Sequence, residues 1–150
     1  MPNWRCNMLF SSLLFLAVHA EGQTSKLQGY WLEPSGGIIQ VASCGADLCA
    51  RIVSFSRKDG PRTDVNNQDH ALRTRSLCAL ELGAGFVPVS DDRAENGHIY
   101  DPKTGKTYTA AMAVEGDVLL LRGYVGIKLF GKTERWLRSS ATPTPCDGGR

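Results

Sequence analysis

The last third of the chain alternates short apolar-rich runs with turn signals, and this pattern constrains the fold more than any other feature. Four such runs follow one another at nearly regular spacing: Asn96–Pro102, Lys103–Val114, Asp117–Gly126 and Leu129–Arg138. Consecutive antiparallel strands in a barrel or sandwich produce this pattern. It indicates an architecture and no chemistry, because no reactive group of side chains lies on it.

Eight strands are predicted along the whole chain, and no segment shows a convincing helical period. Their ranges are Leu27–Glu33, Ile38–Ser43, Leu48–Phe55, Leu77–Gly83 (continued by Phe86–Val89), His98–Asp101, Thr107–Val114, Val118–Val125 and Lys132–Arg138. The polar stretch Ser56–Leu72 is predicted to be a long loop. This series predicts an all-β, eight-stranded antiparallel up-and-down barrel, and a two-sheet sandwich is the alternative.

Residues 1–20 have the pattern of a secretory signal peptide. Arg5 precedes the apolar run Met8–Val18, and Val18 and Ala20 are small residues at the −3 and −1 positions of a cleavage site, so cleavage is predicted after Ala20. A membrane anchor is the rival interpretation, but eleven apolar residues span only about 17 Å as a helix, against a hydrocarbon core of roughly 30 Å. We therefore expect export to the periplasm or the outside, with no transmembrane segment left after cleavage.

Residues 21–138 are expected to form one barrel domain, and residues 139–150, rich in proline and glycine, a flexible C-terminal tail. The net charge is +2, and removal of Arg5 with the signal peptide leaves +1. The basic residues are interleaved with acidic ones, so a nucleic-acid partner is not expected.

Four cysteines follow the predicted cleavage point, and an even count in an oxidising compartment favours disulfides over zinc. Cys44 and Cys49 flank a four-residue loop between two apolar runs, where paired hairpin positions lie close enough for a disulfide. We favour this pairing. Cys78–Cys146 would close a long loop and attach the tail, although Cys78 could equally be a buried free thiol.

Catalytic chemistry has little support in the sequence. His70 and His98 have no nucleophile suggested by spacing, and a triad needs its three groups in contact. The series Asp64-x-Asn66-x-Gln68 begins like a calcium loop but lacks the required glycine and distal glutamate, so we interpret it as turn-forming. We predict no catalytic residue, no metal site, no cofactor and no enzymatic activity.

Several sequence blocks together resemble a known family. In chain order they are Cys44-Gly45-x-x-Leu48-Cys49-x-Arg51-Ile52-Val53, Leu72-Arg73-x-Arg75-x-Leu77, Ile99-Tyr100-Asp101-Pro102, Gly105-Lys106-Thr107-Tyr108, Arg122-Gly123-Tyr124-Val125-Gly126, and Phe130-Gly131-Lys132-Thr133 with Trp136. The chain is similar to the bacterial domain-of-unknown-function family 2147. The resemblance implies an exported protein with a lipocalin-like, eight-stranded barrel around a central cavity, and implies no particular biochemical function. The family usually has proline where Gln68 and Ser76 stand.

Arginine and tryptophan residues on the predicted strands suggest a plug at one end of the barrel. Lipocalin-like barrels carry Gly-x-Trp on the first strand beside an arginine, and Gly29-Tyr30-Trp31 resembles this element. Arginine stacks well on tryptophan, so we interpret Trp31, Trp136 and Arg138 as a barrel-end plug. For Arg51 and Arg122, a structural role and a role in a ligand cavity remain open.

Two functions of different class follow. The first is an exported binder or carrier that holds a small amphipathic molecule, anionic and fatty-acid-like, in the barrel cavity. For this function, Tyr108 and Met112 are expected to point inward, Arg122 to meet the anionic group, and Arg51 and Tyr124 to complete the ligand-binding set. The alternative is a non-enzymatic structural or interaction domain of the cell envelope, with a barrel filled by side chains.

Overall fold

Turns and loops join each strand to the next, so that strands adjacent in sequence are adjacent in space. A computed structural model describes residues 25–55, 61–140 and 142–146 of this protein. Its strands are β1 (Gly29–Leu32), β2 (Ile38–Cys44), β3 (Asp47–Ser54), β4 (Glu81–Pro88), β5 (Arg93–Asp101), β6 (Lys106–Glu115), β7 (Val118–Tyr124) and β8 (Lys132–Ser139). Two short 3₁₀ helices, η1 (His70–Leu72) and η2 (Lys128–Phe130), lie in the β3–β4 and β7–β8 connections.

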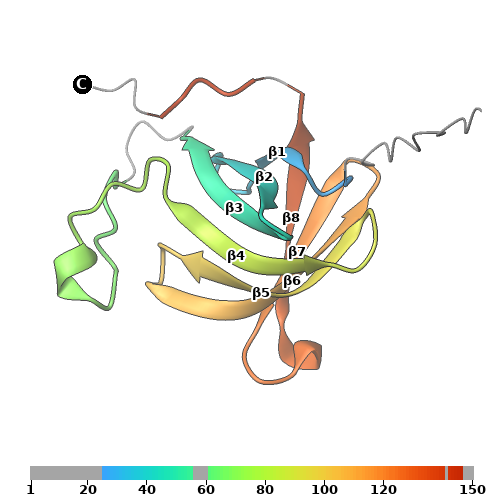
Figure 1. Ribbon diagram of the computed structural model, residues 1–150. Coiled ribbons are helices and arrows are strands. Elements are labelled where there is room, and N and C mark those ends of the chain that lie inside the picture. Colours follow the sequence, from blue (N-terminus) through green and yellow to red (C-terminus); the bar gives the residue numbers. More distant parts are fainter. Residues whose placement is uncertain (1–24, 56–60, 141, 147–150) are drawn as a thin grey trace, which may run out of the picture.

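All neighbouring strands pair antiparallel, and the sheet closes on itself (Figure 1). The last strand pairs with the first through Tyr30 with Ser139 and Trp31 with Arg138. Closure satisfies the backbone groups that an open sheet would leave unpaired at its edges. The predicted up-and-down barrel is confirmed, and the sandwich alternative is wrong.

Two strands begin far from their predicted first residues, whereas the other six begin within two residues of them. The fourth begins at Glu81 and not at Leu77, because Ala79 has a φ of 60° that interrupts the extended chain. The fifth begins at Arg93 and not at His98, since the polar residues before His98 are already part of the strand. A register shift between Ala94 and Gly97 interrupts the alternation of inward and outward side chains, so the sequence of this strand does not show a regular period of two.

Alternate residues of the strands face inward and form one core. On β6, Ala110, Met112 and Val114 all belong to it. Phe86 is fully buried, and a Cβ on Gly97 would lie only 2.3 Å from its ring. Glycine at this inward position therefore provides the space that the phenylalanine ring occupies.

One end of the barrel is closed by the segment that precedes β1. The Trp31 indole Nε1 donates a hydrogen bond to the Leu27 carbonyl at 2.9 Å, and both side chains are fully buried. The Arg138 guanidinium lies 4.1 Å from the centroid of the Trp31 ring and donates to the Lys26 carbonyl at 2.7 Å. These contacts tie the chain before the first strand to the last strand.

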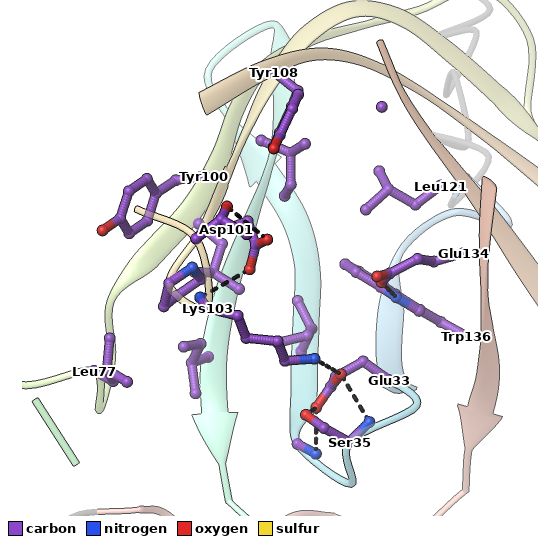
Figure 2. A pocket seen from close by; sticks show the side chains of 18 of the residues that line it. Glu33, Ser35, Leu77, Tyr100, Asp101, Lys103, Tyr108, Leu121, Glu134 and Trp136 are labelled. Carbon is purple, nitrogen blue, oxygen red and sulfur yellow. Dashed lines mark hydrogen bonds and ion pairs between the residues drawn. The ribbon is translucent and has the colours of Figure 1, made fainter. Parts of the chain in front are cut away.

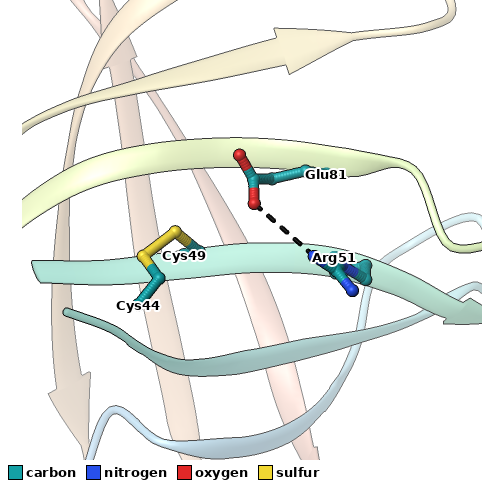
Figure 3. Close-up of a disulfide and its surroundings, with 4 residues drawn as sticks. All are labelled: Cys44, Cys49, Arg51 and Glu81. Carbon is teal, nitrogen blue, oxygen red and sulfur yellow. Dashed lines mark ion pairs between the residues drawn. A yellow bond between two sulfur atoms is a disulfide. The ribbon is translucent and has the colours of Figure 1, made fainter.

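Two disulfides fix the connections outside the core. Cys44 and Cys49, with Cα atoms 5.9 Å apart, bridge the β2–β3 turn (Figure 3). Cys78 and Cys146, with Cα atoms 5.6 Å apart, hold the C-terminal segment on the β3–β4 loop. The Cys146 amide also donates to the Val53 carbonyl at 3.1 Å. The tail predicted to be flexible is thus attached to the barrel at Cys146, whereas residues 147–150 and the predicted signal peptide lie outside the described residues.

Candidate functional site

The connections β1–β2, β3–β4, β5–β6 and β7–β8 lie at the same end of this up-and-down barrel, opposite the closed end. Residues from all four surround a cavity of about 880 Å³ that continues into the barrel (Figure 2). Its apolar wall includes Ile39, Ile52, Leu77, Leu82, Ile99, Leu121 and Trp136, and its polar residues include Glu33, Arg62, Asn66, Asp101, Lys103, Tyr108, Lys132 and Glu134. Ligand sites in proteins commonly occupy roughly 300–1,000 Å³, so the cavity has the size of a small-molecule site.

A row of three side chains on β8 extends from the open end of the cavity into its depth. Lys132, Glu134 and Trp136 pair with Gly123, Leu121 and Leu119 of β7 and are spaced two apart, so they share the inner face. The Trp136 Nε1 donates to Glu134 Oε2 at 3.0 Å, which occupies one oxygen of that carboxylate. Within the described part of the chain, the Lys132 ammonium has no hydrogen bond or ion pair.

The Glu33 carboxylate lies at the rim, the open end of the cavity formed by the four connections, and both its oxygens accept hydrogen bonds from neighbouring residues. It accepts hydrogen bonds from the Ser35 and Gly37 amides, each at 2.9 Å, and from the Ser35 hydroxyl. Lys103 Nζ lies 3.6 Å from it, so an ion pair links the β1–β2 turn to the β5–β6 hairpin across the rim (Figure 2). Burial alone would raise the pKa of Glu33, but these hydrogen bonds and the Lys103 charge outweigh it and lower the pKa.

The long β3–β4 loop is held against the barrel by a buried carboxylate, Asp64. Its oxygens accept hydrogen bonds from the Tyr100 hydroxyl at 2.6 Å, the Asn67 amide at 2.7 Å and the Arg75 Nε at 2.8 Å. The Arg75 Nη2 completes an ion pair at 2.7 Å. Burial would raise the pKa of Asp64, but these donors and the Arg75 charge lower it overall. The network positions Arg62, Asn66 and Leu77, which line the cavity.

Two of the five residues predicted to bind a ligand line the cavity. These are Tyr108, on the inner face of β6, and Tyr124, at the end of β7 near the rim. Met112 faces inward as expected, but it is packed in the core below the cavity, only 2% exposed, and is not part of the wall.

The two predicted arginines point elsewhere. Arg51 is exposed and its Nη2 lies 3.7 Å from Glu81 Oε2 on the neighbouring strand, next to the Cys44–Cys49 hairpin (Figure 3). Arg122 pairs with Ala111, whereas the inward position beside it is Leu121, which pairs with Met112. Strand alternation therefore places Arg122 on the outer face, against the expectation that it reaches the interior.

Arg122 supports the β7–β8 connection. Its guanidinium donates to the Lys128 carbonyl at 2.9 Å, the Leu129 carbonyl at 2.9 Å and the Thr133 hydroxyl at 2.8 Å. Among the three predicted plug residues, Trp31 and Arg138 are in contact at the closed end, while Trp136 lies in the wall of the cavity.

The sequence interpretation missed the charged residues of the rim. Lys132, Glu134 and Trp136 follow a period of two, which could have indicated an inward polar row. Glu33 and Lys103 come from different turns, and no sequence signal links them. Among the described residues, no cluster of three or more His, Cys, Asp or Glu side chains could hold a metal ion. No helix there is long and apolar enough to cross a membrane.

Comparison with known proteins agrees with this geometry. The profile of a bacterial family described as "Uncharacterized protein conserved in bacteria (DUF2147)" matches residues 29–138. The chain belongs to this family. A comparison with curated proteins gave no match. A solved structure is similar: HP1028 from Helicobacter pylori, described as belonging to the lipocalin family, has a TM-score of 0.71 and 22% identity, over 78% of this chain and 85% of that chain. This likeness shows a shared lipocalin-like fold.

The structure gives a physical reason for several of the family-like sequence blocks. Arg73, Arg75 and Tyr100 all contact the β3–β4 loop network: Arg73 Nε donates to the Asn67 carbonyl at 2.8 Å, and Arg75 lies over the Tyr100 ring at 5.3 Å. Gly105 has a φ of 68°, and a Cβ there would lie 2.0 Å from the Asn66 carbonyl oxygen. The blocks that are distant in sequence thus meet where the long loop docks beside the cavity.

Proposed function

We propose that this protein is an exported, non-enzymatic binder or carrier of a small amphipathic ligand with an anionic head group, such as a fatty acid. The observation that carries the proposal is the cavity of about 880 Å³, apolar in its depth and open at one end. A barrel that served only as a structural domain would gain stability from filling this volume.

The charges around the cavity favour an anionic head group at the open end. The carboxylates of Glu33 and Glu134 already accept hydrogen bonds from Ser35, Gly37 and Trp136. The Lys132 ammonium faces the cavity without a partner among the described residues. An anionic head group would supply that partner, while its hydrocarbon chain would lie against Leu121, Ile99 and Trp136.

Export is supported by the signal-peptide pattern of residues 1–20 and by the two disulfides, which form in oxidising compartments. Intact-mass measurement of protein isolated from the envelope or medium should give a mature chain that begins at Glu21.

The ligand proposal is tested by titrating the mature protein with a fluorescent long-chain fatty acid and with the matched fatty alcohol. We expect the acid to bind more tightly, and Lys132→Gln to weaken binding of the acid by about tenfold, the value of one charged hydrogen bond, with little effect on the alcohol. Lys106→Gln, an exposed lysine outside the cavity wall, is the matched control and should bind both probes as wild type does.

If neither probe binds the wild-type protein, the carrier proposal is wrong and the structural alternative is favoured. If both probes bind equally and Lys132→Gln changes neither affinity, the cavity binds apolar chains but the anionic head group is wrong.

A further inference from the structure

The β7–β8 connection carries an unusual concentration of exposed apolar side chains. Val125 is 77% exposed, Ile127 58%, Leu129 76% and Phe130 79%. The connection forms a loop that projects from the barrel, drawn in orange at the bottom of Figure 1. Single exposed apolar residues are ordinary on protein surfaces, but four within six consecutive positions form a patch that calls for a partner.

Contacts from the barrel side fix the backbone of this loop, and the exposure of its apolar side chains follows from these contacts. Arg122 binds the carbonyls of Lys128 and Leu129, and the Lys128 ammonium reaches Glu95 on β5, with nitrogen–oxygen distances of 2.6 and 2.8 Å. The backbone polar groups and the cation thus face the barrel. The apolar side chains are left on the opposite side, toward solvent.

The charge of the surrounding segment is positive. Between Val118 and Thr133 the chain contains Arg122, Lys128 and Lys132 and no aspartate or glutamate. Lys128 is neutralised by Glu95, whereas Arg122, which supports the loop from the barrel side, and Lys132, which lies at the mouth of the cavity, have no acidic partner among the described residues. An apolar patch on a segment of net positive charge matches the interface of a bilayer with anionic headgroups.

The patch is also continuous with the cavity, because Val125 and Phe130 line its open end. It is too short for a typical specific protein interface, which uses about 20–30 residues on each side. We propose that the Val125–Phe130 loop docks on a lipid surface with anionic headgroups and thereby brings the mouth of the cavity against the membrane. Docking itself does not depend on the proposed ligand.

The test is co-sedimentation of the mature protein with vesicles of phosphatidylglycerol and phosphatidylcholine. The informative variant is Ile127→Ser/Leu129→Ser, since neither residue lines the cavity and both are exposed. We expect its vesicle affinity to fall by about tenfold or more, as the loss of two inserted apolar side chains predicts. Val89→Ser is the matched control: Val89 is 59% exposed but lies in the β4–β5 turn, at the other end of the barrel.

Titration with the fluorescent fatty acid in the absence of vesicles separates the two proposals, because the double variant should retain wild-type affinity for that probe. The docking proposal is overturned if wild-type protein does not bind the vesicles, or if the double variant binds them as well as wild type does. It is equally overturned if light scattering shows a wild-type dimer that the double variant dissociates, since the patch would then be a contact between copies. Equal binding to vesicles of phosphatidylcholine alone would overturn the requirement for anionic headgroups.

Discussion

Replacing Asp64 by asparagine should reveal how strongly the β3–β4 loop depends on this buried carboxylate. The side chain of Asp64 is fully buried and accepts four contacts from three residues: Tyr100, Asn67 and both Nε and Nη2 of Arg75. Asparagine has nearly the same shape, but it removes the charge and converts one acceptor oxygen into a donor that faces other donors.

The expected loss of stability follows from these contacts. Removing one partner of a buried ion pair typically costs about 3–5 kcal/mol, because the remaining charge loses its compensation. Here the Arg75 side chain is 34% exposed, so water can solvate part of its freed charge. We therefore expect a loss near the lower limit, about 3 kcal/mol. With an m-value of about 2 kcal/mol per M, the urea midpoint should fall by about 1.5 M.

The loss should also depend on pH. The pKa of Asp64 is lowered from its ordinary value of 3.8 in the folded protein, so the unfolded chain takes up the proton first. The stabilisation is then fully present above about pH 5 and is lost as the pH falls through the folded pKa. Wild type and Asp64→Asn should differ most at neutral pH and converge in acid.

Urea unfolding, followed by tryptophan fluorescence between neutral and acid pH with disulfides intact, measures both effects. Asp117→Asn is the matched control, since that carboxylate is 90% exposed and its removal should cost less than about 0.5 kcal/mol. The reasoning is refuted if Asp64→Asn unfolds at the same urea concentration as Asp117→Asn, or if its stability changes with acid as much as that of wild type.

Two further predictions concern the loops at the open end of the barrel. Arg122→Gln should lower the free energy of unfolding by about 1–2 kcal/mol and speed hydrogen exchange of the amides in 126–131, because the guanidinium donates to the carbonyls of Lys128 and Leu129. A large loss of fatty-acid affinity with unchanged hydrogen exchange would instead mean that Arg122 acts on the ligand. Gly105→Ala should lower the free energy of unfolding by about 2–4 kcal/mol, because its Cβ would clash with Asn66. Gly116→Ala is the control: Gly116 has a similar φ of 60°, but a Cβ there would meet no atom within 4 Å, so the loss should be about 1 kcal/mol. Equal urea midpoints for the two variants would contradict the clash with Asn66.

The barrel could be predicted from the sequence because the signals that specify it lie within single strands and turns. Turn residues separate the strands, and the alternation in Tyr108–Val114 identifies the face that enters the core. The same alternation failed for β5, because a register shift near Asn96, whose φ is 60°, lets polar residues continue a strand that looks like a turn. A bulge changes which face a residue occupies, and the sequence does not mark its position.

The candidate site was predicted less well because it depends on register and on contacts between distant segments. Whether Arg122 faces inward depends on a shift of one residue in β7, which its apolar neighbours alone did not determine. The partners of Asp64 and Glu33 come from segments far away in the sequence: Asp64 binds Tyr100, and Glu33 binds Lys103. A carboxylate in a polar stretch was therefore interpreted as a turn former, although it is among the most buried groups of the protein.

The pattern of small residues on the inner face explains why this barrel is filled at one end and hollow at the other. An eight-stranded barrel is just wide enough for ordinary side chains to fill, so a cavity requires inward positions without bulky groups. Gly83 and Gly97 are two such positions, but Phe86 occupies the space beside both. Gly123 is a third, and a Cβ there would meet no atom closer than 3.6 Å. Among the described residues, no other side chain fills the space beside Gly123. Gly123 therefore lines the cavity together with Tyr108 and Lys132, where the proposed ligand would bind.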